Sequence, residues 1–339
     1  MRWSRTLNLV DVHCSGEIGR VLTGGVLDIP GDTIAQKLAY INEVDDSLRR
    51  LVCSEPRSGP AGSVVLLLPA TVIEADVGFI VLQADRAHAM SGSNAMCAVT
   101  AMLETGMKPM IEPETTVVLD TAAGLVRAKA ACENGKVVSV TLDMPAAFVY
   151  ADNLRLRFAE FGEINYHVVF GGVFYALVDV SAVGMEICPE NARRLADIGV
   201  AMRADMEAVD RPVHPLAPEV NGISYVMFYQ DMPDGSVKTA TTMPPGRVDR
   251  SPCGTGSTAR MALRHHQDGC NVDQVQLSSS TIGGQFKTQF KQETSVGSFN
   301  AIDVQVSGQS WIYGFSTMGL DPSDPFQQGF MVADTWGAI

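Results

Sequence analysis

Two short segments of the chain combine a potential proton carrier with residues that open a helical pattern. They are residues 91–94 (Ser-Gly-Ser-Asn) and residues 253–256 (Cys-Gly-Thr-Gly), and they lie in opposite halves of the 339-residue chain. A hydroxyl or thiol at such a position could move a proton to or from a bound substrate. We therefore expect one active site, built between two halves that each supply one proton carrier.

The second segment offers an anion site next to a base. Backbone N–H groups that open a helix are unpaired and carry partial positive charge, so Gly254 and Thr255 could let them face one carboxylate. The same field is expected to lower the pKa of the Cys253 thiol from about 8.5 to between about 3.5 and 7.5. Asp249, four residues upstream, could accept a hydrogen bond from a substrate ammonium. These residues predict an amino-acid pocket with a base at the α-carbon.

Simpler interpretations of the same residues stay open. A cysteine is more often a small buried apolar residue than an acid–base group, and Cys97 and Cys270 are interpreted in that way. Asp249 could be only a turn or capping residue. The histidines show no metal-ligand spacing and the seven cysteines form no CxxC pair, so neither a metal site nor a disulfide framework is predicted. Reduced thiols favour a cytoplasmic protein.

Similar elements surround the two segments, and their order predicts a duplicated unit of helix, two strands, loop, helix and strands. Each segment follows a helical pattern and two strand-like runs, and each precedes further alternating runs. The ranges are 34–41, 64–68, 72–82 and 116–142 in the first half, and 189–203, 223–229, 237–243 and 275–306 in the second.

Composition favours a soluble α/β (α+β) enzyme. A chain of 339 residues is expected to form about two domains. No apolar run approaches the roughly 20 residues needed to cross a bilayer, so no membrane association is expected. The net charge of −13 argues against nucleic acid as a partner, because phosphates require basic patches.

The residues around Cys253 resemble the signature of a known family. Residues 249–256 (Asp-Arg-Ser-Pro-Cys-Gly-Thr-Gly) are similar to the second signature of the proline racemase family, which includes 4-hydroxyproline 2-epimerases and trans-3-hydroxy-L-proline dehydratases. Weaker matches extend the resemblance over nearly the whole chain. They lie at residues 11–17, 55–57, 90–92, 171–179 and 321–326.

The resemblance implies a fold like that of diaminopimelate epimerase. It has two pseudo-symmetric halves, each with strands wrapped around a central helix, and an active site between them. We expect the first half at residues 1–160 plus roughly 315–339, and the second at residues 161–314. The resemblance implies no cofactor, neither pyridoxal phosphate nor a metal, and hydroxyproline as the small-molecule substrate. A homodimer fits the family, although the sequence leaves the oligomeric state open.

The resemblance also assigns roles in the second half by position. Cys253 matches the second of two catalytic cysteines that face opposite sides of the substrate α-carbon. Asp249 matches the acid that holds the ring nitrogen, and Gly254 and Thr255 match the amides that bind the carboxylate.

The first signature departs from the family pattern. The family commonly has Met-Cys-Gly-His, whereas this chain has Met-Ser-Gly-Ser at residues 90–93. Ser91 therefore stands at the position of the first catalytic cysteine, and Gly92 keeps the small residue that begins the helix. Ser93 replaces a histidine that helps to hold the substrate nitrogen.

The pair Ser91 and Cys253 favours dehydration as the main activity. A serine hydroxyl is a weak acid–base group unless another group activates it. We expect cofactor-independent dehydration of trans-3-hydroxy-L-proline to 1-pyrroline-2-carboxylate, by α-proton abstraction and loss of the 3-hydroxyl, with weaker 2-epimerisation of trans-4-hydroxy-L-proline. Which of the two residues is the base stays open, because family dehydratases commonly lose the second cysteine rather than the first. The alternatives are a 4-hydroxyproline 2-epimerase and a non-catalytic amino-acid-binding protein.

Overall fold

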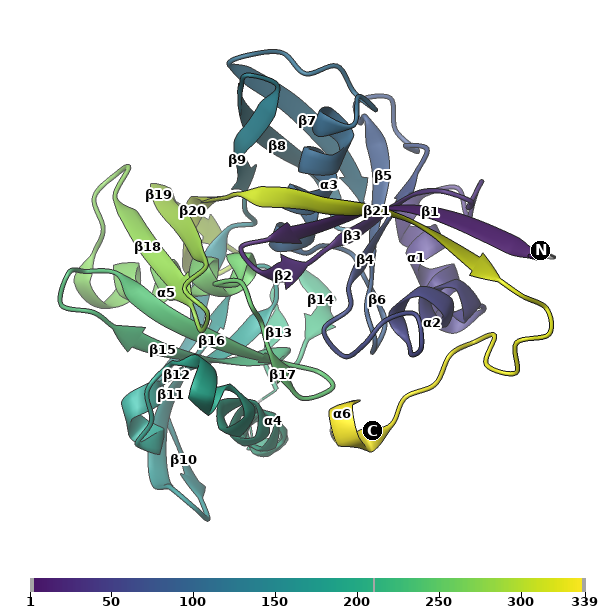
Figure 1. The fold of residues 1–339 in the computed structure, drawn as a ribbon. Helices are drawn as coiled ribbons and strands as arrows, with labels where there is room; N and C mark the ends of the chain where they lie inside the picture. The colour runs from purple at the N-terminus through teal and green to yellow at the C-terminus, as the bar shows by residue number, and fades with distance from the viewer. Residues whose placement is uncertain (1–2, 210, 337–339) are drawn as a thin grey trace. The chain divides into compact units, whose positions relative to one another are not determined.

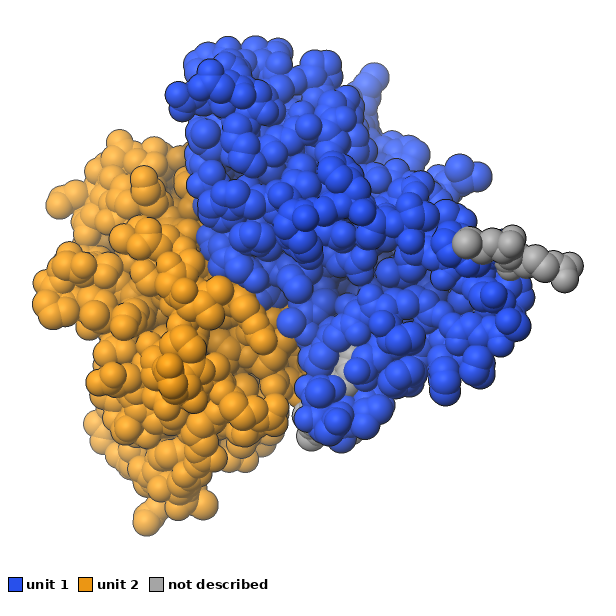
Figure 2. Space-filling model, viewed as in Figure 1, with its two compact units in different colours: residues 1–142, 308–339 blue, residues 143–307 orange. Residues whose placement is uncertain are grey.

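The computed structural model describes residues 3–209 and 211–336, and the chain divides into two compact units (Figures 1 and 2). Unit 1 comprises residues 1–142 and 308–339, and unit 2 comprises residues 143–307. The expected boundaries lie too far along the chain. Residue 160 falls in the hairpin that joins β10 (Ala147–Phe158) to β11 (Gly162–Phe170), and residue 314 falls inside β21 (Ser310–Leu320). Strand β10 pairs with β11 of unit 2, and β21 pairs with β1 of unit 1. The two unit boundaries therefore lie before β10 and before β21.

Unit 1 is built on a curved sheet whose neighbouring strands run in the order β21-β1-β3-β4-β5-β7-β8-β9. The short strands β2 and β6 pair with β1 and β5. The remaining bounds are β1 Arg5–Cys14, β2 Glu17–Ile18, β3 Arg20–Gly24, β4 Val64–Leu68, β5 Val77–Leu82, β6 Ala87–His88, β7 Glu114–Thr121, β8 Gly124–Glu133 and β9 Lys136–Asp143.

One helix of unit 1 lies inside the curve of the sheet. Helix α3 (Gly92–Glu104) contacts β1, β3, β4, β8 and β21, and its first twelve residues are buried (Figure 1). Helices α1 (Ile34–Glu43) and α2 (Ser47–Cys53) cover the other face, where Leu48 and Leu51 join a core cluster with Leu9 and Leu66. A short helix, α6 (Ala333–Trp336), lies near the end of the chain. The residues after β21 are grouped with unit 1.

Unit 2 is a closed barrel. Its strands pair in the order β10-β11-β12-β15-β16-β18-β19-β20, and β20 pairs again with β10, which closes the ring. Strand β17 pairs antiparallel with the end of β16, and β13 and β14 form a separate hairpin. The remaining bounds are β12 Phe174–Asp179, β13 Val213–His214, β14 Ala217–Asn221, β15 Tyr225–Asp231, β16 Val237–Met243, β17 Arg247–Val248, β18 Val275–Ser280, β19 Gln285–Val296 and β20 Phe299–Gly308.

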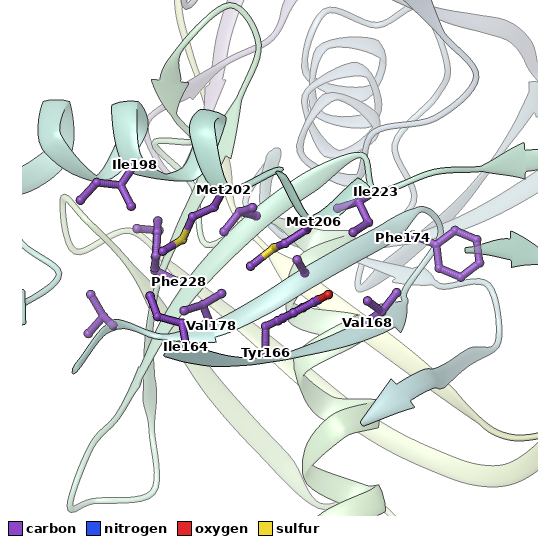
Figure 3. Packing of buried hydrophobic residues seen from close by; sticks show 14 of the residues in the cluster. Ile164, Tyr166, Val168, Phe174, Val178, Ile198, Met202, Met206, Ile223 and Phe228 are labelled. Atoms are coloured by element: carbon purple, nitrogen blue, oxygen red, sulfur yellow. The ribbon is translucent and has the colours of Figure 1, made fainter. Parts of the chain in front are cut away.

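The barrel of unit 2 also has one helix inside and one outside. Helix α5 (Gly254–Asp268) contacts β10, β11, β12 and β19 and is buried over most of its first turns. Helix α4 (Ala192–Val209), preceded by 3-10 turns at Val180–Val183 and Pro189–Asn191, lies outside on β15, β16 and β17. Figure 3 shows Met202 and Met206 of α4 over Tyr166 and Phe228 of the barrel strands, in the main hydrophobic core of this unit.

The two units share one topology, as the sequence predicts. In each unit, a parallel strand pair leads to an antiparallel pair, and then a second parallel pair is connected through the inner helix. Thus β3, β4, β5 and β7 with α3 correspond to β12, β15, β16 and β18 with α5. Both candidate segments, 91–94 and 253–256, therefore lie at the amino end of an inner helix. No helix among residues 3–209 and 211–336 is long and apolar enough to cross a membrane.

Candidate active site

Ser91 stands at the N-cap of α3 in unit 1. Its backbone is extended, with φ −154° and ψ 126°, and its carbonyl accepts the first helical hydrogen bond from Ala95 N at 2.9 Å. The Ser91 side chain makes no capping hydrogen bond, although serine commonly caps a helix in this way. Instead, Ser91 Oγ lies 3.4 Å from Ser93 Oγ. Gly92 and Ser93, the other predicted residues of this unit, form the buried first turn.

An asparagine that was not predicted as a site residue contacts Ser91. Asn94 Nδ2 donates a hydrogen bond to Ser91 Oγ at 2.9 Å, and Asn94 is only 1% exposed. The other end of this amide, Asn94 Oδ1, accepts from Ser63 Oγ at 3.0 Å. Gly19 packs so closely here that a Cβ atom on it would lie 2.9 Å from Asn94 Oδ1. The Asn94 amide is therefore fixed from two sides.

Cys253 occupies the same position on α5 in unit 2, but with a strained backbone. Its φ of 67° lies in the left-handed region, which costs a residue other than glycine on the order of 1–3 kcal/mol. Hydrogen bonds hold it there, because Cys253 N donates to Ser251 Oγ at 3.1 Å and its carbonyl accepts from Ser257 N at 2.8 Å. Such strain is common at functional positions.

The Cys253 thiol faces the hydroxyl of Tyr175, a residue of β12. The distance from Tyr175 Oη to Cys253 Sγ is 3.2 Å, and the same hydroxyl lies 2.6 Å from Thr255 Oγ1. Thr255 Oγ1 itself lies 3.9 Å from Cys253 Sγ. Two glycines let β12 begin this close to the helix, since a Cβ atom on Gly171 would lie 2.3 Å from Thr255 O and one on Gly172 would lie 2.9 Å from Thr255 Cγ2.

The expected low pKa of Cys253 is wrong for the substrate-free site. Burial first, and then the charge of Asp249, raise the pKa of this thiol to about 12, against hydrogen bonds from Tyr175 and the Gly256 backbone that lower it. Cys253 is only 8% exposed. The loss of hydration therefore raises the thiol pKa by more than the field of the helix terminus lowers it. Without substrate, Cys253 is a neutral thiol near pH 7.

Asp249 is buried beside this thiol and forms a tight turn. Its Oδ1 atom accepts hydrogen bonds from Ser251 N at 2.8 Å and from Ser251 Oγ at 2.9 Å. The turn-forming role that the sequence left open is therefore present. Ser251 in turn holds the Cys253 backbone, so Asp249 also supports the strained residue that carries the thiol.

The structure groups the predicted residues within each unit. Four of them, Cys253, Asp249, Gly254 and Thr255, share one loop and helix start in unit 2. Ser91, Gly92 and Ser93 share the matching place in unit 1. Tyr175 and Asn94 are not among the residues predicted from the sequence. Signals for both were present, since residue 175 lies in the weaker match at 171–179 and Asn94 ends the first segment.

Cys97 is the small buried residue that the sequence predicts, whereas Cys270 is only half-buried. Cys97 is fully buried inside α3, and burial holds its pKa well above the usual value. Cys270 lies beyond the carboxyl end of α5, 3.8 Å from the sulfur of Met261. Among the described residues, no group of three or more His, Cys, Asp or Glu side chains is placed to hold a metal ion.

Comparison with known sequences places nearly the whole chain in one family. The family model described as "Proline racemase" matches residues 9–331. The chain is 47% identical over its whole length to a 4-hydroxyproline 2-epimerase from Allorhizobium ampelinum, covering 98% of that protein. It is 34% identical, over 98% of its length, to a 4-hydroxyproline 2-epimerase from Streptosporangium roseum, all of which is covered.

Comparison with solved structures agrees. A hydroxyproline epimerase from Agrobacterium vitis, crystallised with bound trans-4-hydroxy-L-proline, matches with a TM-score of 0.94 and 47% identity over 100% of this chain and 98% of that one. The Bacillus anthracis phenazine biosynthesis protein of the PhzF family matches with a TM-score of 0.59 and 10% identity, over 93% of this chain and 99% of that one, and so shares the fold. The predicted mixed α/β fold, related to diaminopimelate epimerase, is thus confirmed, and the chain belongs to the proline racemase family.

Proposed function

We propose that this protein is a 4-hydroxyproline 2-epimerase, which inverts the α-carbon of trans-4-hydroxy-L-proline to give cis-4-hydroxy-D-proline. The observation that carries the proposal is the similarity, over the whole chain, to an epimerase structure that holds trans-4-hydroxy-L-proline. The relatives named above support the same reaction.

This proposal replaces dehydration as the leading function. The sequence favoured dehydration because Ser91 is a weaker proton carrier than a cysteine. That asymmetry does not prevent inversion, because a hydroxyl can deliver a proton to the α-carbon while the thiolate of Cys253 removes one. The epimerase alternative is also favoured by the names of the relatives from Allorhizobium ampelinum, Streptosporangium roseum and Agrobacterium vitis, each of which is an epimerase.

In our proposal, some residues of the two helix starts transfer protons and the others bind the substrate. Ser91 and Cys253 exchange protons with the α-carbon, so that one removes a proton while the other supplies one. Unpaired amides at the two helix starts bind the substrate carboxylate, and side chains near them hold the ring nitrogen. The amides belong to Gly92, Gly254 and Thr255, and the side chains to Ser93 and Asp249.

Substrate binding must also prepare Cys253 for proton removal. In the free protein, burial and the charge of Asp249 keep the thiol neutral. A cationic ring nitrogen held beside Asp249 offsets that negative charge and brings a positive charge near Sγ. Opposite charge within about 4–6 Å favours the ionised form of an acid. The base therefore forms when the substrate is bound rather than before.

A side-by-side assay of the purified protein tests the proposal. Trans-4-hydroxy-L-proline and trans-3-hydroxy-L-proline are supplied separately, and products are followed by chiral chromatography and by mass spectrometry for loss of water. We expect inversion of the 4-hydroxy compound as the faster reaction. Loss of water from the 3-hydroxy compound, with no inversion of the 4-hydroxy compound, would restore the dehydratase interpretation.

A further inference from the structure

A chain of hydrogen bonds with two buried residues at its centre ends on the Ser91 side chain. Gln83 Nε2 donates to Ser63 Oγ at 3.4 Å, Ser63 Oγ donates to Asn94 Oδ1 at 3.0 Å, and Asn94 Nδ2 donates to Ser91 Oγ at 2.9 Å. Ser63 is fully buried and Asn94 is 1% exposed. Gln83 and Ser91, at the two ends of the chain, are half-buried, so water cannot replace the two central members, Ser63 and Asn94.

The order of donors in this chain has a chemical basis. The Ser63 hydroxyl has a single hydrogen and already accepts from Gln83, so it directs that hydrogen toward Asn94 Oδ1. With its carbonyl oxygen so occupied, the Asn94 amide presents its NH₂ group to Ser91. Ser91 Oγ is thus an acceptor of this hydrogen bond, and its own hydrogen is left for another partner.

We infer that Asn94 is a positioning residue that stabilises negative charge on Ser91 Oγ, and so allows a serine to serve where the family commonly has a cysteine. The inference rests on the proposed epimerase function. It deepens that function by naming the group that assists the weaker of the two proton carriers.

Inversion of the α-carbon leaves a negative charge on Ser91 Oγ, and the hydrogen bond from Asn94 stabilises that charge. As Cys253 takes the α-proton on its thiolate, Ser91 gives its hydroxyl proton to the α-carbon, where a new C–H bond forms. Ser91 Oγ then holds the negative charge that Cys253 has lost. An alkoxide is far less stable than a thiolate, so a preorganised N–H donor at Oγ lowers the free energy of this state. In the reverse direction the same alkoxide removes the α-proton.

Two structural features keep the donor in place. Ser63 holds the far end of the amide, and Gly19 leaves just enough room for it, since a Cβ atom there would approach Asn94 Oδ1 to 2.9 Å. Ser91 Oγ makes no capping bond to the α3 backbone. The oxygen is therefore held by a side chain rather than by the helix, as an acid–base group requires.

A double-mutant cycle tests the inference on the full-length protein. Asn94→Ala is made both in the wild-type chain and in a Ser91→Cys chain, and kcat and KM are measured with trans-4-hydroxy-L-proline. A thiolate at position 91 needs no amide to carry the charge. We expect Asn94→Ala to lower kcat about 10- to 100-fold in the serine background, the range of a hydrogen bond to a charged group. In the cysteine background the loss should be below about 3-fold, with KM within about 2-fold throughout.

A milder variant and a matched control guard against damage to the fold. Ser63→Ala removes the bond that orients the Asn94 amide, and it should reproduce the pattern with a smaller loss, again confined to the serine background. Asn42→Ala is the control, because Asn42 is a structural asparagine of the same unit that bonds the backbone of Ala87 at 3.0 and 2.8 Å. Its effect, whatever its size, should be the same in both backgrounds.

The outcomes separate the two proposals. Equal losses from Asn94→Ala in the serine and cysteine backgrounds would overturn the role of Asn94 and leave the epimerase function standing. An inactive Ser91→Cys chain would also overturn it, since a thiol should carry the charge unaided. A wild-type chain that does not invert trans-4-hydroxy-L-proline would overturn the proposed function itself, and the role of Asn94 with it.

Discussion

The hydroxyl of Tyr175 lies 3.2 Å from the sulfur of Cys253, and both residues are buried. A thiolate deprived of water needs hydrogen-bond donors in its place. The Tyr175 hydroxyl can donate to Sγ when Cys253 is charged, and it can turn toward Thr255 Oγ1, 2.6 Å away, when Cys253 is a thiol. Tyr175 therefore offers a donor in the charged state without a change in its own protonation.

Replacing Tyr175 by phenylalanine should slow the reaction at Cys253. Loss of a hydrogen bond to a charged group leads us to expect a fall in kcat of about 10-fold or more. Tyr166→Phe is the matched control, since Tyr166 is a buried tyrosine of the hydrophobic core of unit 2. Steady-state kinetics of the two variants make the comparison, and an unchanged kcat for Tyr175→Phe would rule out this role.

The reactivity of Cys253 toward iodoacetamide should report its raised pKa. With a pKa of about 12, the thiolate fraction at pH 8 is far below that of an ordinary cysteine, so alkylation of the substrate-free protein should be at least about 10-fold slower. The rate should rise steadily with pH up to pH 10. Mass spectrometry that resolves each cysteine measures this, and a plateau below pH 9 would instead indicate the low pKa first expected from the sequence.

Adding a methyl group at Gly171 should displace the start of α5. The new Cβ atom would lie 2.3 Å from Thr255 O and 2.6 Å from Ala259 N, which are backbone atoms that cannot move separately. We expect Gly171→Ala to lower the unfolding free energy by about 1–3 kcal/mol and to lower kcat/KM. Gly59→Ala is the control, because a Cβ atom there meets nothing within 4 Å. Thermal unfolding and kinetics that do not distinguish the two variants would contradict the close packing.

Buried thiols should make the fold less stable at alkaline pH. Burial raises the pKa of Cys53 to about 12 from an ordinary 9.0. The unfolded chain therefore loses this proton first, and stability that is complete below pH 9 falls as pH rises toward 12. At pH 10 the expected loss is about 1.4 kcal/mol for this thiol. Urea unfolding at pH 8 and pH 10 should show a smaller loss for Cys53→Ala than for wild type, and an equal loss would be evidence against this effect.

Much of the fold could be predicted from repeated patterns. The order of apolar runs around residues 91 and 253 predicts the duplicated topology, because each run marks one buried strand or helix and the same order recurs in both halves. The unit boundaries at residues 142 and 307 could not be predicted in this way. They depend on which sheet β10 and β21 join, and that pairing brings together residues far apart in the sequence.

The site could be predicted only in part, for a related reason. Cys253, Gly254 and Thr255 are neighbours in sequence, so one motif reveals them. Tyr175, which contacts the thiol of Cys253, lies on a strand 78 residues earlier in the sequence. Ser63, which contacts Asn94, directly precedes β4 and is 31 residues away in the sequence. The pKa of Cys253 also depends on packing between distant segments. Burial raises this pKa by more than the helix terminus, which the sequence does indicate, lowers it.

The most direct test of the proposed epimerase is the fate of the α-proton in D₂O. The wild-type chain should convert trans-4-hydroxy-L-proline to cis-4-hydroxy-D-proline that carries deuterium at the α-carbon, and Ser91→Ala and Cys253→Ala should each abolish the conversion. Proton NMR follows the α-hydrogen, and chiral chromatography identifies the epimer. If the wild-type chain forms no epimer, or if either alanine variant inverts the substrate at the wild-type rate, then Ser91 and Cys253 are not the two proton carriers of an epimerase.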